Sequence, residues 1–313
     1  MSWLTGLTPA QEWLVTDLLG KDQPRPAVDR DLAASLRQQL EEGVAPFVRE
    51  LPEGDQIFLN KTALTAITTC DGRYLDHVET PFSWSRAPIV GRLTHKAVEL
   101  DWHTEATLAS DEVVRRAIDE VREESAGVAA WLDDLDDASA RILASQVTQL
   151  LIEVRDTWPT LPPRAGVRSE QPLRVRLAGG RVALSGTPDV IIGRARADEA
   201  RMLLVDFKTG IRRPQSERDE LRFYGLLATI KYGVPPWRWA AFYLAECAWD
   251  AEDATEELLR VTVRRVVDGV ERAVALRTAP AGNAELRLHG GSWCRFCSRR
   301  PTCPAAPADV PDS

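Results

Sequence analysis

The chain has 313 residues, of which 44% are hydrophobic and 27% are charged, enough to bury a core in one large or two modest domains. No stretch approaches the roughly 20 apolar residues that cross a bilayer. The N-terminus lacks the basic flank and cleavage site of a secretory signal, so we expect a cytoplasmic protein without a membrane partner. The net charge of −8 argues against a surface that coats nucleic acid non-specifically, but local basic patches can still bind DNA.

Helical patterns dominate the first half of the chain, where apolar residues recur at spacings of three and four. The segments with this pattern are a short one around Trp13, residues 29–42 and residues 88–155. A Pro-rich linker at residues 23–26 separates the first two segments, and Pro162 and Pro163 mark a loop at residues 160–166. We therefore predict a largely helical first half.

Strand patterns begin after that loop. Residues 171–178 and 181–185 alternate apolar and polar side chains around Gly179-Gly180, which predicts a hairpin. Further predicted elements are strands at residues 189–192, 202–207 and 239–245, a helix at residues 217–231, and a strand followed by a helix within residues 257–278. The predicted fold is α/β, with helices around one small mixed sheet.

Two short motifs bring charged residues to this sheet. Residues 186–189 read Gly-Thr-Pro-Asp and residues 206–208 read Asp-Phe-Lys, with sixteen residues between the two aspartates. Antiparallel strands joined by a turn would set Asp189 beside Asp206. Strand alternation puts Asp206 and Lys208 on one face and turns Phe207 into the core.

Two carboxylates and a lysine in this arrangement predict a site for a hard cation. Oxygen ligands suit Mg²⁺ or Mn²⁺, which lowers the pKa of a bound water, and Lys208 can orient that water. The alternative is a surface ion pair that contributes little to stability. The apolar run before Asp206 favours the metal site, because unpaired charges are rare in such a setting unless they are functional.

The five cysteines divide into a cluster and two isolated residues. Cys294, Cys297 and Cys303 lie within ten residues, whereas Cys70 and Cys247 stand alone. A cytosolic setting argues against a disulfide framework. Three thiolates do not complete a zinc or iron–sulfur site, so a fourth ligand is required, and both isolated cysteines are candidates.

Together the motifs resemble the RecB-like branch of the PD-(D/E)XK nucleases. Residues 205–210 (VDFKTG) are similar to its DxKTG strand, residues 186–189 to its GxxD motif and residues 91–95 (GRLTH) to its GxxxH motif. Residues 220–224 (ELRFY) match QxxxY, except that glutamate stands in place of glutamine. The resemblance implies metal ligation by His95, Asp189, Asp206 and the backbone carbonyl of Phe207, and catalytic roles for Asp189, Asp206, Lys208, Glu220 and Tyr224.

Two of these residue assignments have structural alternatives. His95 is one of four histidines, and a lone helical histidine is often a hydrogen-bonded structural residue. Tyr224 lies among apolar neighbours and fits a core position equally well. An imidazole beside two carboxylates, if His95 is a ligand, shifts the metal preference from Mg²⁺ toward Mn²⁺.

The cysteine spacing resembles that of the iron–sulfur nucleases in this branch, which include CRISPR-associated adaptation exonucleases, the AddB nuclease domain and the exonuclease V family. In these proteins one cysteine follows a helical segment similar to residues 64–70, and a C-x2-C-x5-C triplet follows the nuclease core. The resemblance therefore implies a structural [4Fe–4S] cluster on Cys70, Cys294, Cys297 and Cys303, with Cys247 as a buried structural thiol. Zinc remains the rival metal for four cysteines.

The resemblance also implies an organisation for the whole chain. It consists of a PD-(D/E)XK core, with helical N-terminal and inserted segments, that an Fe–S staple holds together. The implied parts are an N-terminal helical extension of unknown role at residues 1–55, a nuclease domain at residues 56–305 (helical segment at about 96–160, catalytic sheet at about 170–250) and a disordered tail at residues 306–313.

The implied activity is metal-dependent hydrolysis of DNA phosphodiesters, at single-stranded ends by analogy with the family. Candidate phosphate contacts are Arg212, Arg213, Arg218 and Arg222, although a solvated helix face explains them almost as well. A helicase or a CRISPR or repair protein is the implied partner. The alternative function is a catalytically weak, cluster-stabilised DNA-binding subunit of a helicase–nuclease or CRISPR adaptation complex.

Overall fold

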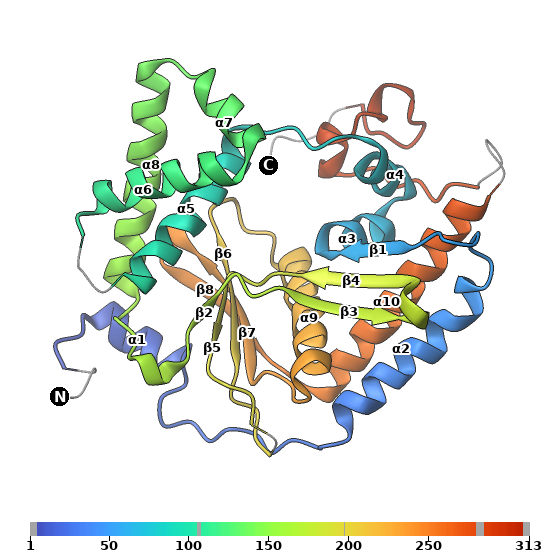
Figure 1. Ribbon diagram of the computed structural model, residues 1–313, viewed down its shortest axis with the longest axis horizontal. Coiled ribbons are helices and arrows are strands. Elements are labelled where there is room, and N and C mark those ends of the chain that lie inside the picture. Colours follow the sequence, from blue (N-terminus) through green and yellow to red (C-terminus); the bar gives the residue numbers. More distant parts are fainter. Residues whose placement is uncertain (1–4, 105–107, 197, 280–284, 309–313) are drawn as a thin grey trace.

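The computed structural model describes residues 5–104, 108–196, 198–279 and 285–308, which form two mixed sheets and ten α-helices (Figure 1). The helices are α1 (Pro9–Asp17), α2 (Leu32–Val48), α3 (Lys61–Thr69), α4 (Asp71–Glu79), α5 (Arg86–His103), α6 (Ser110–Glu124), α7 (Ala126–Asp133), α8 (Asp137–Thr157), α9 (Pro214–Tyr232) and α10 (Glu256–Thr278). The strands are β1 (Ile57–Asn60), β2 (Arg168–Ser169), β3 (Leu173–Leu177), β4 (Val182–Gly186), β5 (Val190–Ile192), β6 (Leu203–Lys208), β7 (Arg238–Tyr243) and β8 (Ala248–Asp253). The α/β class is confirmed.

The strands form two sheets, so the prediction of one central sheet is wrong. The smaller sheet has the order β1-β4-β3, and the larger has the order β2-β5-β6-β7-β8. The predicted hairpin is confirmed, because β3 and β4 pair antiparallel with Leu177 opposite Val182. β1, β2 and β8 were not predicted; the side chains of β8 are half-buried or exposed, so β8 lacks the apolar alternation that marks a strand.

The five-stranded sheet separates two hydrophobic cores. Along β6, Leu203, Val205 and Phe207 face the first core, which α1 and α5–α8 complete. Leu204 faces the second core, which is formed with α2, α3, α9, α10 and the smaller sheet. Figure 1 shows these two groups of helices on opposite sides of β6 and β7. The end of β6 that carries Lys208 is therefore flanked by both groups.

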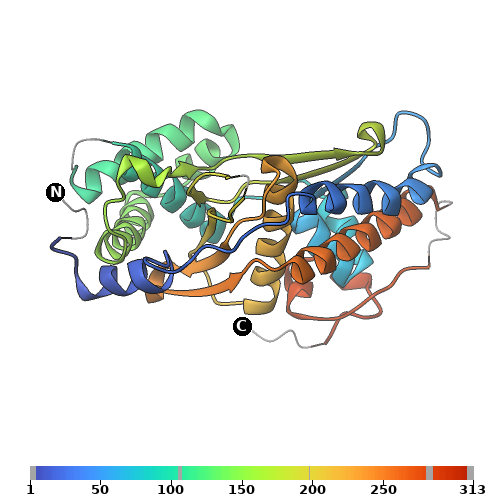
Figure 2. The same ribbon diagram turned by 90° about the horizontal axis from the view of Figure 1, so that it is seen from below.

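The N-terminal segment contributes to both cores. Helix α1 has a capping box between Thr8 and Gln11 and buries Leu14 in the first core. Helix α2 runs beyond the predicted residue 42 to Val48, because Val44 and Val48 also pack into the second core. Figure 2 shows α2 beside α10 along one face. Helices α1 and α2 are therefore packed into the two cores of the domain.

Two helical regions differ from the prediction in detail. Residues 256–278 form one helix, α10, so the strand predicted at its start is wrong. Its Val- and Thr-rich sequence resembles a strand, but Val263, Val266 and Val270 lie on one helical face buried in the second core. The predicted helical segment after residue 88 consists of four helices, α5–α8.

Two further predictions concern the membrane and the tail. Over the described ranges, no helix combines the length and apolar character needed to span a bilayer. Residues 309–313 of the predicted disordered tail lie outside the described residues.

Candidate active site

Asp189 and Asp206 lie side by side at one end of the larger sheet. β5 and β6 are antiparallel with Val190 opposite Val205, which places Asp189 opposite Asp206, as the predicted antiparallel pairing requires. The Phe207 amide donates a hydrogen bond to Asp189 Oδ2 over 2.6 Å. The register of two strands therefore fixes the distance between the two carboxylates.

His95 approaches the same strand end from α5. Its Nδ1 lies 3.0 Å from Asp189 Oδ1, and its Nε2 lies 3.1 Å from the carbonyl oxygen of Phe207. A Cβ at Gly91 would lie 3.4 Å from Thr209 Oγ1, so the small glycine lets α5 pack closely against the end of β6. Burial opposes protonation of His95, but the Asp189 carboxylate outweighs it and raises the pKa of the imidazole.

Lys208 lies on the same face of β6 as Asp206, as predicted. Its Nζ lies 2.7 Å from Asp206 Oδ2 and 3.0 Å from Glu220 Oε2 on α9. Burial disfavours the charge on each partner, but their attraction outweighs it. The pKa of Lys208 is therefore raised, and the pKa of Asp206 falls well below its ordinary value because of Lys61 and Lys208.

A second lysine, Lys61, completes this group of charges and was not predicted. Its Nζ lies 3.5 Å from Asp206 Oδ1 and 3.5 Å from Glu220 Oε2. Asn60, whose side chain caps α3, places Lys61 at the first position of that helix. The available sequence signal is that Lys61 is the only charged residue within residues 56–70.

Tyr224 is buried in the second core directly beneath the charged groups. A Cβ at Gly186 would lie 2.5 Å from Tyr224 Cε1, so the glycine of the GTPD motif is what lets the ring approach β4. Lys61 Nζ lies 5.3 Å from the centre of the ring. Burial raises the pKa of the Tyr224 hydroxyl, which therefore stays protonated.

An aromatic layer supports the opposite face of β6. Phe207 makes edge contacts with Trp102, Trp158 and Phe242, with ring centres 5.8 to 5.9 Å apart. The layer fixes which face of β6 turns to the core, because a slip of one residue would put Asp206 among these rings. Packing of Phe207 on the buried face of β6 therefore fixes the direction in which Asp206 and Lys208 point on the other face.

The four arginines proposed as phosphate contacts are mostly paired with acidic residues. Arg212 lies 2.7 Å from Glu246, and Arg218 and Arg222 each bind a β8 carboxylate through two nitrogens. In the described part of the chain, Arg213 has no such carboxylate partner. The predicted phosphate-binding patch stays a prediction, with only Arg213 free of an ion pair.

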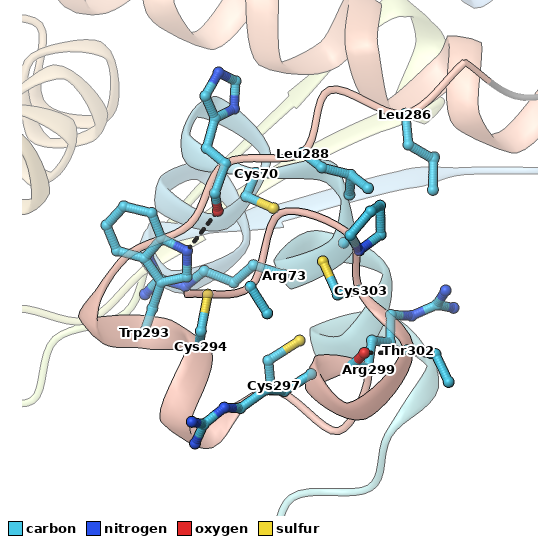
Figure 3. Close-up of a pocket in the computed structure, with 15 residues that line it drawn as sticks. Cys70, Arg73, Leu286, Leu288, Trp293, Cys294, Cys297, Arg299, Thr302 and Cys303 are labelled. Carbon is cyan, nitrogen blue, oxygen red and sulfur yellow. Dashed lines mark hydrogen bonds between the residues drawn. The ribbon is translucent and has the colours of Figure 1, made fainter. Parts of the chain in front are cut away.

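Four cysteines line a cavity of about 140 Å³ between the start of α4 and the C-terminal segment (Figure 3). Cys70, from the junction of α3 and α4, faces Cys294, Cys297 and Cys303 of the C-terminal segment. Cys247 lies elsewhere, half-buried, with its sulfur 3.2 Å from Glu153 Oε2. It is therefore less buried than predicted and far from the triplet's cavity.

Polar contacts dock the C-terminal segment on α4. Asp71 is 1% exposed and accepts hydrogen bonds from the Arg272 guanidinium and, over 2.5 Å, from the Arg287 amide. The Ser298 amide donates to Asp76 over 3.2 Å, and Arg299 pairs with Glu79. These contacts, rather than regular secondary structure, hold the cysteine triplet opposite Cys70.

Neither site is arranged as a finished metal centre. Among the described residues, no three His, Cys, Asp or Glu side chains are grouped closely enough to hold an ion as they stand. At the sheet end, His95, Asp189 and Phe207 bind one another, but two carboxylates, an imidazole and a carbonyl are donors that suit Mg²⁺ or Mn²⁺. Four thiols line the second cavity, and thiolates are donors that suit zinc or an iron–sulfur cluster.

Comparisons with known proteins identify the family. No curated protein matches the sequence significantly. The crystal structure of SSO0001 is similar with 12% identity over 87% of this chain and 96% of that chain, but its TM-score of 0.35 is too low to support any conclusion. Residues 60–304 match the PD-(D/E)XK nuclease superfamily, whose members are generally nucleases that use divalent metals. The chain therefore belongs to the PD-(D/E)XK nuclease superfamily.

Proposed function

We propose that the protein is a metal-dependent deoxyribonuclease of the RecB-like iron–sulfur branch that acts as an exonuclease on single-stranded DNA ends in the cytoplasm. The observation that carries this proposal is the convergence of His95, Asp189, Asp206 and Lys208 at the end of β6. These residues come from α5, β6 and the residue before β5, so three separate motifs meet at one point. The DNA-end preference rests on the resemblance alone.

The roles of the side chains follow from their contacts. A divalent metal bound by His95, Asp189, Asp206 and the Phe207 carbonyl would supply a bound water of lowered pKa and polarise the phosphate. Lys208, oriented by Glu220, is placed to hold the attacking water or to offset charge that develops on the phosphate. Glu220 departs from the usual glutamine, and here its carboxylate positions both lysines.

The cysteine pocket supports an iron–sulfur cluster as the second inorganic group. Four thiols line one cavity, and Cys70 lies more than two hundred residues before the other three. Four thiolates suit zinc as well as a [4Fe–4S] cluster, and the preference for the cluster rests on the resemblance in cysteine spacing. The role of the cluster is structural, since it would join α4 to the C-terminal segment.

The nuclease proposal is tested with purified protein and end-labelled single-stranded DNA, linear or circular, with and without Mn²⁺. We expect cleavage of the linear strand only, and only with Mn²⁺. Cleavage of the circle would replace the exonuclease by an endonuclease. Binding of DNA without cleavage would favour the DNA-binding subunit, an alternative that the glutamate at position 220 and the net charge of −8 support.

The cluster proposal is tested separately by elemental analysis after anaerobic purification. We expect iron, acid-labile sulfide and a brown colour. One zinc per chain and no iron would reject the cluster but leave the nuclease proposal intact.

A further inference from the structure

Four charged side chains form a closed ring at the candidate active site. Asp206 contacts Lys208 through Oδ2 and Lys61 through Oδ1. Glu220 contacts both lysines through the same oxygen, Oε2. Each carboxylate therefore lies between two ammonium groups, and each ammonium lies between two carboxylates.

The two lysines are not held equally. Lys208 lies 2.7 and 3.0 Å from its carboxylate partners, which are hydrogen-bond distances. Lys61 lies 3.5 Å from both of its partners, and its side chain is 30% exposed against 17% for Lys208. Lys61 is held by attraction to the two carboxylates and by its position over the Tyr224 ring, and it lies at the first position of α3.

We infer that Lys61 is a catalytic residue with two positions: it balances Asp206 and Glu220 while no metal is bound, and it turns to a non-bridging oxygen of the substrate phosphate once a metal binds. The inference rests on the proposed nuclease function. A divalent cation on Asp206 would lie close to the Lys61 ammonium and repel it. The incoming phosphate is then the nearest anion without a cationic partner.

The local packing allows this movement without loss of the fold. The Lys61 ammonium lies 5.3 Å from the centre of the Tyr224 ring, and the Asn60 side chain, rather than Lys61, caps α3. Lys61→Met keeps an unbranched apolar stem in the same place and removes only the charge. Lys61→Arg keeps the charge, and Lys21→Met removes a lysine charge from the surface near Trp237, at the opposite end of the sheet.

Metal affinity is the first readout, and it does not require activity. Calorimetric titration with Mn²⁺ should show about tenfold tighter binding for Lys61→Met than for wild type, because one repelling charge is gone. Lys61→Arg and Lys21→Met should bind Mn²⁺ like wild type. Unchanged or weaker affinity in Lys61→Met would overturn the inference, and so would a wild type that binds no Mn²⁺.

The salt dependence of DNA binding is the second readout. DNA binding is measured with Ca²⁺ in place of Mn²⁺ and a single-stranded oligonucleotide. In Lys61→Met, the negative slope of log K for DNA binding against log salt concentration should become less steep by about 0.7, the value for one lost phosphate contact. Lys61→Arg should keep the wild-type slope, because arginine can make the same phosphate contact. If Lys61 were only structural, the slope would be the same in wild type and Lys61→Met. An unchanged slope in Lys61→Met would show that Lys61 does not contact a phosphate.

The inference and the proposed function can fail separately. Wild-type cleavage with Mn²⁺, combined with wild-type affinity and slope in Lys61→Met, would reject the role of Lys61 and keep the nuclease. Absence of wild-type cleavage would reject the nuclease, and with it the phosphate half of the inference. The metal titration would then still decide whether Lys61 balances the charges of Asp206 and Glu220 while no metal is bound.

Discussion

The candidate active site and the cysteine pocket are built in different ways. At the active site, the register of β5 and β6 fixes Asp189 and Asp206, and hydrogen bonds and ion pairs connect the charged groups. At the cysteine pocket, a C-terminal segment of 3₁₀ turns lies against α4 (Figure 3). Its anchors are a few polar contacts, with Asp71 as the most buried of them.

This difference indicates which site needs its inorganic group in order to form. The sheet end is supported by two cores and by charges that balance one another, so we expect it to keep its geometry without a metal. No described residue of the C-terminal segment belongs to either hydrophobic core, and ligand bonds to a cluster would join segments that are far apart in the sequence. We therefore expect loss of the cluster to destabilise the protein much more than loss of the catalytic metal.

Cys70→Ala should have the largest effect. We expect a colourless, aggregation-prone protein whose free energy of unfolding falls by about 5 kcal/mol or more, since structural metal bonds contribute directly to folding. Cys247→Ala is the matched control and should keep both iron and colour, because its thiol lies beside Glu153. The measurements are iron content and thermal unfolding; iron retained in Cys70→Ala would refute the ligand assignment.

Phe207→Ala should come next, with a loss of about 3–5 kcal/mol in the free energy of unfolding. The ring lies at the centre of contacts with Trp102, Trp158 and Phe242, and its removal leaves a cavity behind β6. Urea unfolding measures the change. A loss below about 1 kcal/mol would mean that the aromatic layer does not hold the active-site strand.

Asp71→Ala should cost about 3 kcal/mol, because it leaves the Arg272 guanidinium without its buried partner. The C-terminal segment should then detach from α4. Limited proteolysis should show faster cutting after residue 285 than in wild type, and iron content should fall. Equal proteolysis in the two proteins would show that Asp71 does not anchor the pocket. Asp55→Ala, which removes an exposed ion pair with Arg277, is the control.

Lys208→Ala should change stability least, by less than about 1 kcal/mol, because Lys61 still balances Asp206 and Glu220. Turnover should fall by about 10²–10³-fold, since the ammonium acts on water or phosphate. Mn²⁺ affinity should be kept or become tighter, because an ammonium 2.7 Å from Asp206 no longer repels the cation. Loss of Mn²⁺ affinity in this variant would contradict the assigned role.

Local sequence patterns predicted the parts of the site that depend on strand geometry. Alternation along residues 202–208 predicted that Asp206 and Lys208 lie on one face of the strand and Phe207 on the other. The predicted antiparallel pairing set Asp189 beside Asp206. Lys61 was missed because its role depends on how α3 packs against α9, which no local pattern encodes. The ion pairs of Arg218 and Arg222 could not be predicted either, because their carboxylate partners lie on β8, a strand that the sequence pattern did not indicate.

Local sequence patterns also could not predict the number of sheets. Alternation predicts that a segment is a strand but not which strand it pairs with, and β1 joins β4 across more than one hundred residues. In α10, a Val- and Thr-rich sequence favoured a strand, and burial of one helical face in the second core decided otherwise.

Cleavage by Asp206→Asn tests the central claim most directly. The substitution keeps the shape of the side chain and removes the charge that a catalytic metal requires, and Asp250→Asn on β8 is the matched control. The measurement is the initial rate of cleavage of end-labelled single-stranded DNA in Mn²⁺. We expect Asp206→Asn to lose cleavage while it stays folded, and Asp250→Asn to cleave like wild type. Wild-type cleavage by Asp206→Asn would contradict a nuclease site at the end of β6.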